Sequence, residues 1–176
     1  MKPVGFENHL IIRSERPDAA ERRAVHSVHR IVFGRTDEAD LVDRLRSEGA
    51  VLASLVAEVQ SRIVGHLLFT RMWIETTQRS VASVALAPIA VLPEHQREGI
   101  GGRLIQHGLE ALREEGERIV LVLGHPEYYR RFGFSCEKAS PLSSAFPPDA
   151  YLALELCDGA LDGIRGKVRY PVAFGV

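Results

Sequence analysis

A short glycine-rich segment carries the clearest chemical signal in this chain of 176 residues. It has the sequence QREGIGG and lies between an apolar run and an amphipathic stretch. The start of a helix exposes unpaired backbone N–H groups and carries partial positive charge, so it favours anions. Glycines there let the backbone approach a ligand that a Cβ would push away. The segment therefore predicts a phosphate cradle, whose residues are Gln96, Arg97, Glu98, Gly99, Ile100, Gly101 and Gly102.

Two arginines, Arg97 and Arg103, could supply flanking positive charge to such a cradle. A second interpretation is a strand-to-helix turn that only needs flexible residues, and glycine content alone favours neither. Two common nucleotide-binding motifs do not fit the segment. A Rossmann pattern starting at Gly99 requires glycine or alanine where Leu104 stands, and the Gly-Lys-Ser/Thr of a P-loop is absent from the sequence.

The segments around the loop predict a mixed order of strands and helices. Apolar spacing predicts helices from about Pro17 to Phe33, from Glu38 to Gly49, after the glycine loop as far as Gly116, and briefly within PEYYRRFGF. Short β-branched or apolar runs predict strands at His9–Arg13, Val51–Val59, Ile63–Ile74, Val81–Val91, Arg118–Gly124 and Tyr151–Leu156. The second, third and fourth of these strands suit an antiparallel meander. The strand, loop, helix and strand from Val81 to Leu123 form a βαβ unit, which requires parallel strands.

Composition limits the class of protein. Hydrophobic residues make up 45% of the chain, and 22 Lys+Arg against 23 Asp+Glu give a formal net charge of -1. This balance argues against a nucleic-acid binder, which usually shows a basic excess. No apolar stretch reaches the roughly 18 residues of a membrane helix, and the amino terminus lacks the apolar core of a signal peptide. With only Cys136 and Cys157, we expect one reduced, cytoplasmic domain over residues 1–176.

The pattern Gln96-x-x-Gly99-x-Gly101 resembles the [QR]-x-x-G-x-[GA] loop of the GCN5-related N-acetyltransferases, the GNAT family. The preceding LAPIAVLPEH resembles the family's irregular strand, and YYRRFGF resembles its later tyrosine element. The wording GHPEYYRRFGF is similar to a bacterial subgroup of predicted N-acetyltransferases. The resemblance covers residues 11–156 and leaves 157–176 as a tail or edge strand. It implies an α/β fold with a central mixed, mostly antiparallel sheet, flanking helices and one βαβ unit.

The resemblance implies that the ligand is acetyl-coenzyme A (acetyl-CoA), the acyl donor, with no metal. Its pyrophosphate would bind backbone N–H groups from Arg97 to Gly102. Its pantetheine arm would bond the irregular strand at Ile89, Ala90 and Val91. Pro88 supports an interruption there independently, because proline cannot donate a hydrogen bond to a sheet and marks a bulge. An ordinary bulge at a bend would have the same sequence.

Acetyl transfer to an amine needs an oxyanion donor, an acid for the thiolate and a base for the amine. We expect the Val91 N–H to serve as the oxyanion donor. Tyr129, which matches the family's tyrosine, is the candidate acid, because a phenol of pKa near 10 stays protonated at neutral pH. The competing interpretation makes Tyr129 a packing aromatic beside Phe132 and Phe134, and the adjacent Tyr128 is a second candidate.

The general base is less well defined by the sequence. His125 follows a buried strand at its carboxyl end and has a suitable reference pKa, and Glu127 lies two residues on. His66, Glu75 or a water chain could serve instead. Many relatives carry an asparagine where this chain has Val122, so no role passes to that position.

His26 and His29 stand three residues apart on the first predicted helix, a spacing that could hold a metal. No third ligand has suitable spacing, so we expect a solvated helix face instead. The acceptor amine, on a small molecule or a protein, should approach the first two helices, where Arg35, Asp37, Glu38 and Asp40 are polar candidates. A non-catalytic acyl-CoA sensor and a nucleotide-binding interaction domain are the alternative functions. A homodimer is an alternative to a monomer, with GKVRYPVAFGV as a contact strand or a tail packed on the sheet.

Overall fold

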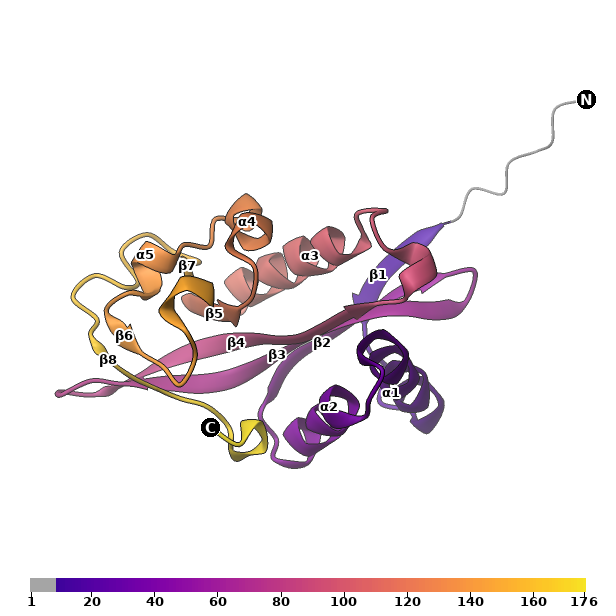
Figure 1. Cartoon of the computed structure of the whole chain (residues 1–176), viewed down its shortest axis with the longest axis horizontal. Coiled ribbons are helices and arrows are strands. Elements are labelled where there is room, and N and C mark those ends of the chain that lie inside the picture. The colour runs from indigo at the N-terminus through magenta and orange to yellow at the C-terminus, as the bar shows by residue number, and fades with distance from the viewer. Residues whose placement is uncertain (1–8) are drawn as a thin grey trace, which may run out of the picture.

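A mixed β-sheet with helices against both faces forms the centre of the computed structural model, which describes residues 9–176 (Figure 1). The strands follow the order β1-β2-β3-β4-β5-β7. Their bounds are β1 Leu10–Ser14, β2 Val51–Val59, β3 Arg62–Glu75, β4 Ser80–Val91, β5 Ile119–Leu123 and β7 Tyr151–Glu155. Along this order the β4–β5 pair is parallel and the other pairs are antiparallel. The predicted meander and βαβ unit are confirmed.

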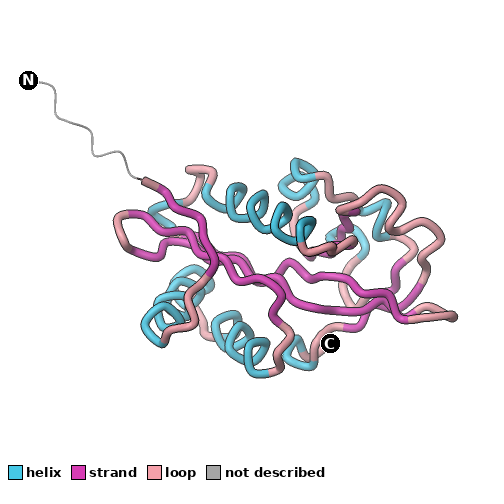
Figure 2. The backbone as a smooth tube through the Cα atoms, turned by 180° about the vertical axis from the view of Figure 1, so that it is seen from behind, coloured by secondary structure: helices cyan, strands magenta, loops and turns pink. Residues whose placement is uncertain are grey.

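The long helices divide between the two faces of the sheet, as the views from the front and from behind show (Figures 1 and 2). Helices α1 (Ala19–Phe33) and α2 (Asp37–Ser47) cover one face, and α3 (Ile100–Glu114) covers the other. The Asp18 side chain caps α1 by accepting a hydrogen bond from the Glu21 N–H at 2.8 Å. The short α4 (Pro126–Tyr129) follows β5 on the side of α3.

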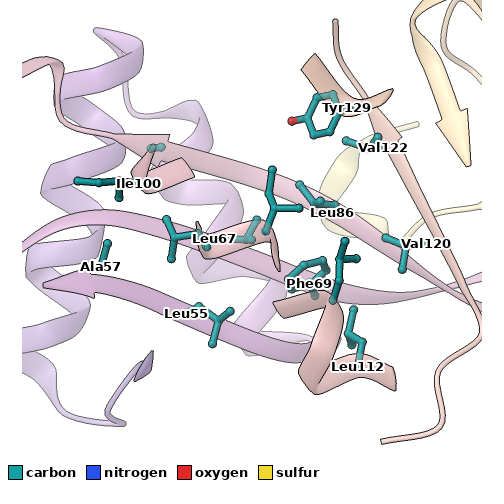
Figure 3. Close-up of a cluster of buried hydrophobic side chains, with 14 of the residues drawn as sticks. Leu55, Ala57, Leu67, Phe69, Leu86, Ile100, Leu112, Val120, Val122 and Tyr129 are labelled. Atoms are coloured by element: carbon teal, nitrogen blue, oxygen red, sulfur yellow. The ribbon is translucent and has the colours of Figure 1, made fainter. Parts of the chain in front are cut away.

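The core between α3 and the sheet is built from the apolar face of the helix. Leu104, Ile105, Leu109 and Leu112 are all buried there. They meet Leu55, Leu67, Phe69 and other inward side chains of β2, β3 and β4 in one apolar cluster (Figure 3). Gly108 lies at the closest point of contact, because a Cβ there would come within 2.2 Å of the Phe69 ring.

Replacing Gly108 with alanine is therefore expected to lower the free energy of unfolding by about 1–3 kcal/mol, since the added methyl overpacks a fixed ring. Gly102→Ala is the matched control in the same helix, because its Cβ would meet Phe132 at 3.5 Å, an ordinary contact. The control should be neutral or gain up to about 1 kcal/mol from helix propensity. Urea unfolding followed by circular dichroism measures both. Equal stability of the two variants would contradict the packing argument.

The β4–β5 pair separates soon after it forms. The two strands are paired at Val84 with Val120 and at Ala85 with Leu121, whereas β4 continues to Val91. On its other side β4 pairs with β3, and the register shifts between Leu67 and Phe69, across from Pro88. The predicted interruption at Pro88 is confirmed. Beyond it, the edge of β4 that faces away from β3 has no strand partner in the described sheet.

The carboxyl-terminal segment adds to the sheet in a way that local patterns left open. Strand β8 (Gly166–Arg169) pairs with β3 at Trp73–Glu75 and with the short β6 (Leu142–Ser143). A turn of 3₁₀ helix at Val172–Phe174 then lies against α2. The segment is thus packed on the sheet. Across residues 9–176, no helix has the length and apolar character needed to cross a membrane.

Candidate functional site

The glycine loop has the backbone geometry of a helix-start anion site. Arg97 and Gly99 adopt left-handed backbone angles, with φ of 64° and 81°, and α3 begins at Ile100. The first intrahelical bond runs from the Arg103 N–H to the Gly99 carbonyl at 3.0 Å. The N–H groups of the first helical residues, from Ile100 to Gly102, therefore have no partner within the helix. These free N–H groups are grouped at the first turn of α3, next to the loop.

The side chain of Gln96 fastens this loop to the end of β4. Its Nε2 donates to the Val91 carbonyl at 2.9 Å. The Leu92 N–H bonds the Val64 carbonyl of the β3 side, so by strand alternation the N–H groups of Val91 and Ile89 point to the opposite, unpaired edge. Gln96 thus uses the Val91 carbonyl and leaves the Val91 N–H available on that edge.

A cavity of about 750 Å³ opens in front of the loop. It brings together most of the predicted binding residues: Val91, Gln96, Arg97, Gly99, Ile100, Gly101, Gly102 and Arg103. Ile89, Ala90 and Glu98 do not line it. Ile89 nevertheless lies close, since its side chain and that of Val91 would each be 3.9 Å from a Cβ at Gly101. Ala90 is buried and Glu98 is exposed, with its carboxylate 3.5 Å from His95.

The cavity also includes residues that the sequence did not suggest for binding: His95, Gln106, Tyr128, Arg131 and Phe132. The Tyr128 hydroxyl would lie 2.9 Å from a Cβ at Gly101, and the Phe132 ring would lie 3.5 Å from one at Gly102. The two glycines therefore admit these aromatic side chains as well as any ligand. The signal available in the sequence was the aromatic spacing of YYRRFGF, but only packing shows that it meets the loop.

Tyr129 lies at the edge of the apolar cluster, 8% exposed, with its ring centroid 5.8 Å from that of Phe134. A Cβ at Gly124 would be 2.3 Å from the Tyr129 ring, so a glycine is required there. Figure 3 shows the ring near Val122 with its hydroxyl directed away from that side chain. Among the described residues the hydroxyl has no hydrogen-bond partner. Burial, and then the neighbouring Tyr128, raise its pKa to about 12.

Comparison with known proteins decides the family. Residues 14–136 match the family model described as an acetyltransferase (GNAT) domain. This chain is a GNAT acetyltransferase. It is 44% identical to the uncharacterized N-acetyltransferase YjhQ of Escherichia coli K12 over 119 residues. The aligned segment covers 66% of each chain. The uncharacterized N-acetyltransferase YhbS of the same strain is 31% identical over 168 residues, 94% of this chain and 98% of YhbS.

Two solved structures share the GNAT fold of this chain. One is the GNAT family N-acetyltransferase YhbS from E. coli in complex with CoA, with TM-score 0.86 and 30% identity over 95% of this chain and 92% of YhbS. The other is a GNAT family acetyltransferase from Brucella melitensis in complex with acetyl-CoA. It has TM-score 0.79 and 34% identity over 95% of this chain and 99% of its own. The expected fold class is confirmed.

The GNAT fold brings none of the candidate bases to the cavity wall. His125 and Glu127 are exposed at the start of α4, where the His125 carbonyl accepts hydrogen bonds from the N–H groups of Tyr128 and Tyr129. His66 is completely buried. Glu75 lies at the far end of β3 and accepts a hydrogen bond from the Ser80 hydroxyl at 2.5 Å. His125 and Glu127 thus stay predictions, with a water chain as the third route.

His29 is fully buried, so the expectation of a solvated face for His26 and His29 is wrong for His29. Helix α1 packs on the sheet through the face that holds Val25, Val28 and His29. The His29 Nε2 lies 2.8 Å from the His66 Nδ1, and the His66 Nε2 lies 2.8 Å from the Ser54 hydroxyl. His26 is half-buried, 3.5 Å from Asp40. The described residues contain no group of three metal-ligating side chains.

The hydrogen-bond chain that runs from His29 through His66 to Ser54 ends at a buried ion pair between Glu15 and Arg46. The Ser54 hydroxyl donates to the Glu15 carboxylate, which also pairs with Arg46. Burial alone would raise the pKa of Glu15, but hydrogen bonds with His66, Arg46 and Ser54 outweigh it and hold the pKa at about 2. Burial, followed by His66 and Arg46, lowers the pKa of His29 to about 3. Burial also lowers the pKa of His66, against the effect of Glu15. The histidines are therefore neutral at neutral pH.

Proposed function

We propose that this GNAT chain transfers an acetyl group from acetyl-CoA to a primary amine by direct attack, with the donor bound in the 750 Å³ cavity. The observation that carries the proposal is the set of unpaired N–H groups from Ile100 to Gly102, which face a cavity beside the unpaired edge of β4. The CoA and acetyl-CoA bound to the YhbS and Brucella proteins support this choice of donor. The cradle interpretation of the glycine loop is thus favoured over a plain turn.

The donor's two ends are assigned to different parts of this cavity. The pyrophosphate would bind the N–H groups at the start of α3, with Arg97 and Arg103 adding charge. The pantetheine arm would run along β4 and use the outward N–H groups of Ile89 and Val91. By the same alternation the N–H and carbonyl groups of Ala90 point toward its partner His66 in β3, so the proposal assigns no hydrogen bond from the arm to Ala90.

The chain's own groups then supply the transfer chemistry. The Val91 N–H stabilises the carbonyl oxygen as the amine nitrogen attacks the thioester carbon. The C–S bond breaks, and the sulfur takes the proton of the Tyr129 hydroxyl. The amine loses its proton to His125, Glu127 or a bound water. A non-catalytic acyl-CoA sensor is the alternative, and it would need the cavity but not the Tyr129 hydroxyl.

The acceptor is proposed to approach α1 and α2, on the face of the sheet across from α3. The polar residues named for this region are already engaged with one another. Arg35 pairs with Glu38 at 2.7 Å and with Asp37 at 3.5 Å, while Asp40 lies beside His26. These pairs are typical of a solvated helix start and do not select one kind of acceptor. The proposal therefore includes amines of small molecules and amines of proteins. It places the enzyme in the cytoplasm, as a monomer or homodimer.

Calorimetric binding of acetyl-CoA, ATP and NAD tests the donor site. Native protein should bind acetyl-CoA selectively, and Gly101→Asp should weaken binding at least about tenfold more than Gly101→Asn, because only the carboxylate repels phosphate. Asparagine is the matched control, since both side chains displace the Tyr128 hydroxyl. Absence of acetyl-CoA binding by folded native protein would overturn the proposal and the sensor alternative together. Equal loss of acetyl-CoA affinity in the two variants would contradict the assignment of the pyrophosphate to this loop.

A further inference from the structure

A second hollow continues the cavity along the outer face of α3. It has a volume of about 190 Å³ and is lined by Gln106, Leu109, Glu110, Arg113, Arg131 and Phe132. Gln106, Arg131 and Phe132 line both hollows. Gln106 is six residues beyond Ile100, about 9 Å along the helix axis at 1.5 Å per residue. The two hollows therefore form one groove that begins at the glycine loop and follows α3.

Arg131 stands at the junction of the two hollows and is held in place there. Its guanidinium carbon lies 4.3 Å from the centre of the Tyr128 ring and 5.5 Å from that of Phe132. Its Nε donates to the Tyr128 carbonyl at 3.1 Å. The ring contacts cover one face of the guanidinium, the Nε is used, and the charge of Arg131 acts on the Tyr128 side chain, lowering its pKa against the larger effect of burial. The two terminal nitrogens make no hydrogen bond within 3.5 Å to a described residue and can bind another group.

The charge of Arg131 is not neutralised within the described part of the chain. Elsewhere arginines bind carboxylates, as in Arg71–Glu117 and Arg35–Glu38. Arg131 has no carboxylate within 4.0 Å among residues 9–176, and neither does Arg113 at the far wall of the second hollow. A preorganised guanidinium with two free nitrogens suits a phosphate group. Glu110 lines the second hollow and would repel an anion deep inside it, so the favourable position is at the junction.

We propose that Arg131 binds the ribose 3′-phosphate of the coenzyme and makes this chain prefer coenzyme A over 3′-dephospho-coenzyme A. The inference rests on the proposed function, which sets the pyrophosphate at Ile100–Gly102 and the pantetheine along β4. The adenosine must then extend from the pyrophosphate in the direction away from β4 and the pantetheine arm. The 3′-phosphate is one ribose away from the pyrophosphate. Arg131 is the cation that lines both the cavity at the glycine loop and the second hollow.

Calorimetry with coenzyme A and 3′-dephospho-coenzyme A tests this assignment through the ratio of their dissociation constants. Native protein should bind coenzyme A at least about tenfold more tightly, as expected for a charge-assisted hydrogen bond. In Arg131→Gln the ratio should fall to within about twofold of one, because only coenzyme A loses affinity. Arg130→Gln is the control, since Arg130 is the exposed neighbour and lines neither hollow.

Other outcomes overturn the assignment in distinguishable ways. Equal weakening of both ligands by Arg131→Gln would show that the residue only supports Tyr128 and the loop. Loss of the ratio in Arg97→Gln but not in Arg131→Gln would place the 3′-phosphate on the other side of the loop. Failure of native protein to bind either ligand would instead reject the proposed function itself.

Discussion

Replacing Tyr129 with phenylalanine is expected to lower kcat by about 10²–10⁴-fold while the dissociation constant of acetyl-CoA changes little. The hydroxyl is the only atom removed, and no described residue hydrogen-bonds to it. Burial raises its pKa to about 12, so it is protonated throughout the neutral range and can donate to a departing thiolate. Phenylalanine keeps the ring against Phe134 and Gly124, so packing is preserved. The measurement pairs acetyl-CoA calorimetry with amine-dependent release of free thiol.

Two further variants separate the acid from its neighbours. Tyr128→Phe removes the hydroxyl beside Gly101 and should change coenzyme affinity more than kcat. Gly124→Ala keeps the Tyr129 hydroxyl but forces its ring to move, because the new Cβ would lie 2.3 Å from it. A large loss of kcat in Gly124→Ala as well would show that the position of the hydroxyl matters. Unchanged turnover in Tyr129→Phe would reduce Tyr129 to the packing role that its burial also suits.

The parts of the site that lie within one βαβ unit were predictable, because their signals are local in sequence. Glycine spacing, the proline at position 88 and the apolar face of α3 each follow from neighbouring residues. Tyr128 and Arg131 were missed as binding residues, since their contact with the loop depends on how two segments about 27 residues apart pack. The pairing of β8 with β3 was left open for the same reason.

For His29 the helical position in the sequence indicated burial, but the polar residue type was given more weight. The apolar spacing that predicts this helix includes Ala24, Val25, Val28, Ile31 and Val32, and His29 stands four residues after Val25, on the face that proves to be buried. Residue type suggested solvent, whereas helical position indicated burial. The position proved right because His66 on β3 supplies a hydrogen-bond partner, and a partner from a distant strand cannot be read from the helix alone.

This buried pair predicts a loss of stability in acid. The pKa of His29 falls from 6.5 to about 3 on folding, so between these values the unfolded chain binds a proton that the folded chain does not. The free energy of unfolding should therefore decrease as pH falls below about 6.5, by up to about 1.4 kcal/mol per pH unit for each buried histidine. Glu15, with its pKa lowered from 4.5 to about 2, adds a further loss below pH about 4.5.

Urea unfolding at a series of pH values from about 7.5 to 5 measures the slope. His29→Gln should lower stability at every pH but flatten the slope by nearly one proton, since the amide can still donate to the His66 Nδ1 and cannot titrate. His107→Gln, at an exposed position on α3, is the control and should leave the slope as in the native protein. An unchanged slope in His29→Gln would mean that His29 is protonated in the folded chain. In that case the Glu15 carboxylate, through Ser54 and His66, would have to stabilise a buried charge that the neutral chain of hydrogen bonds excludes.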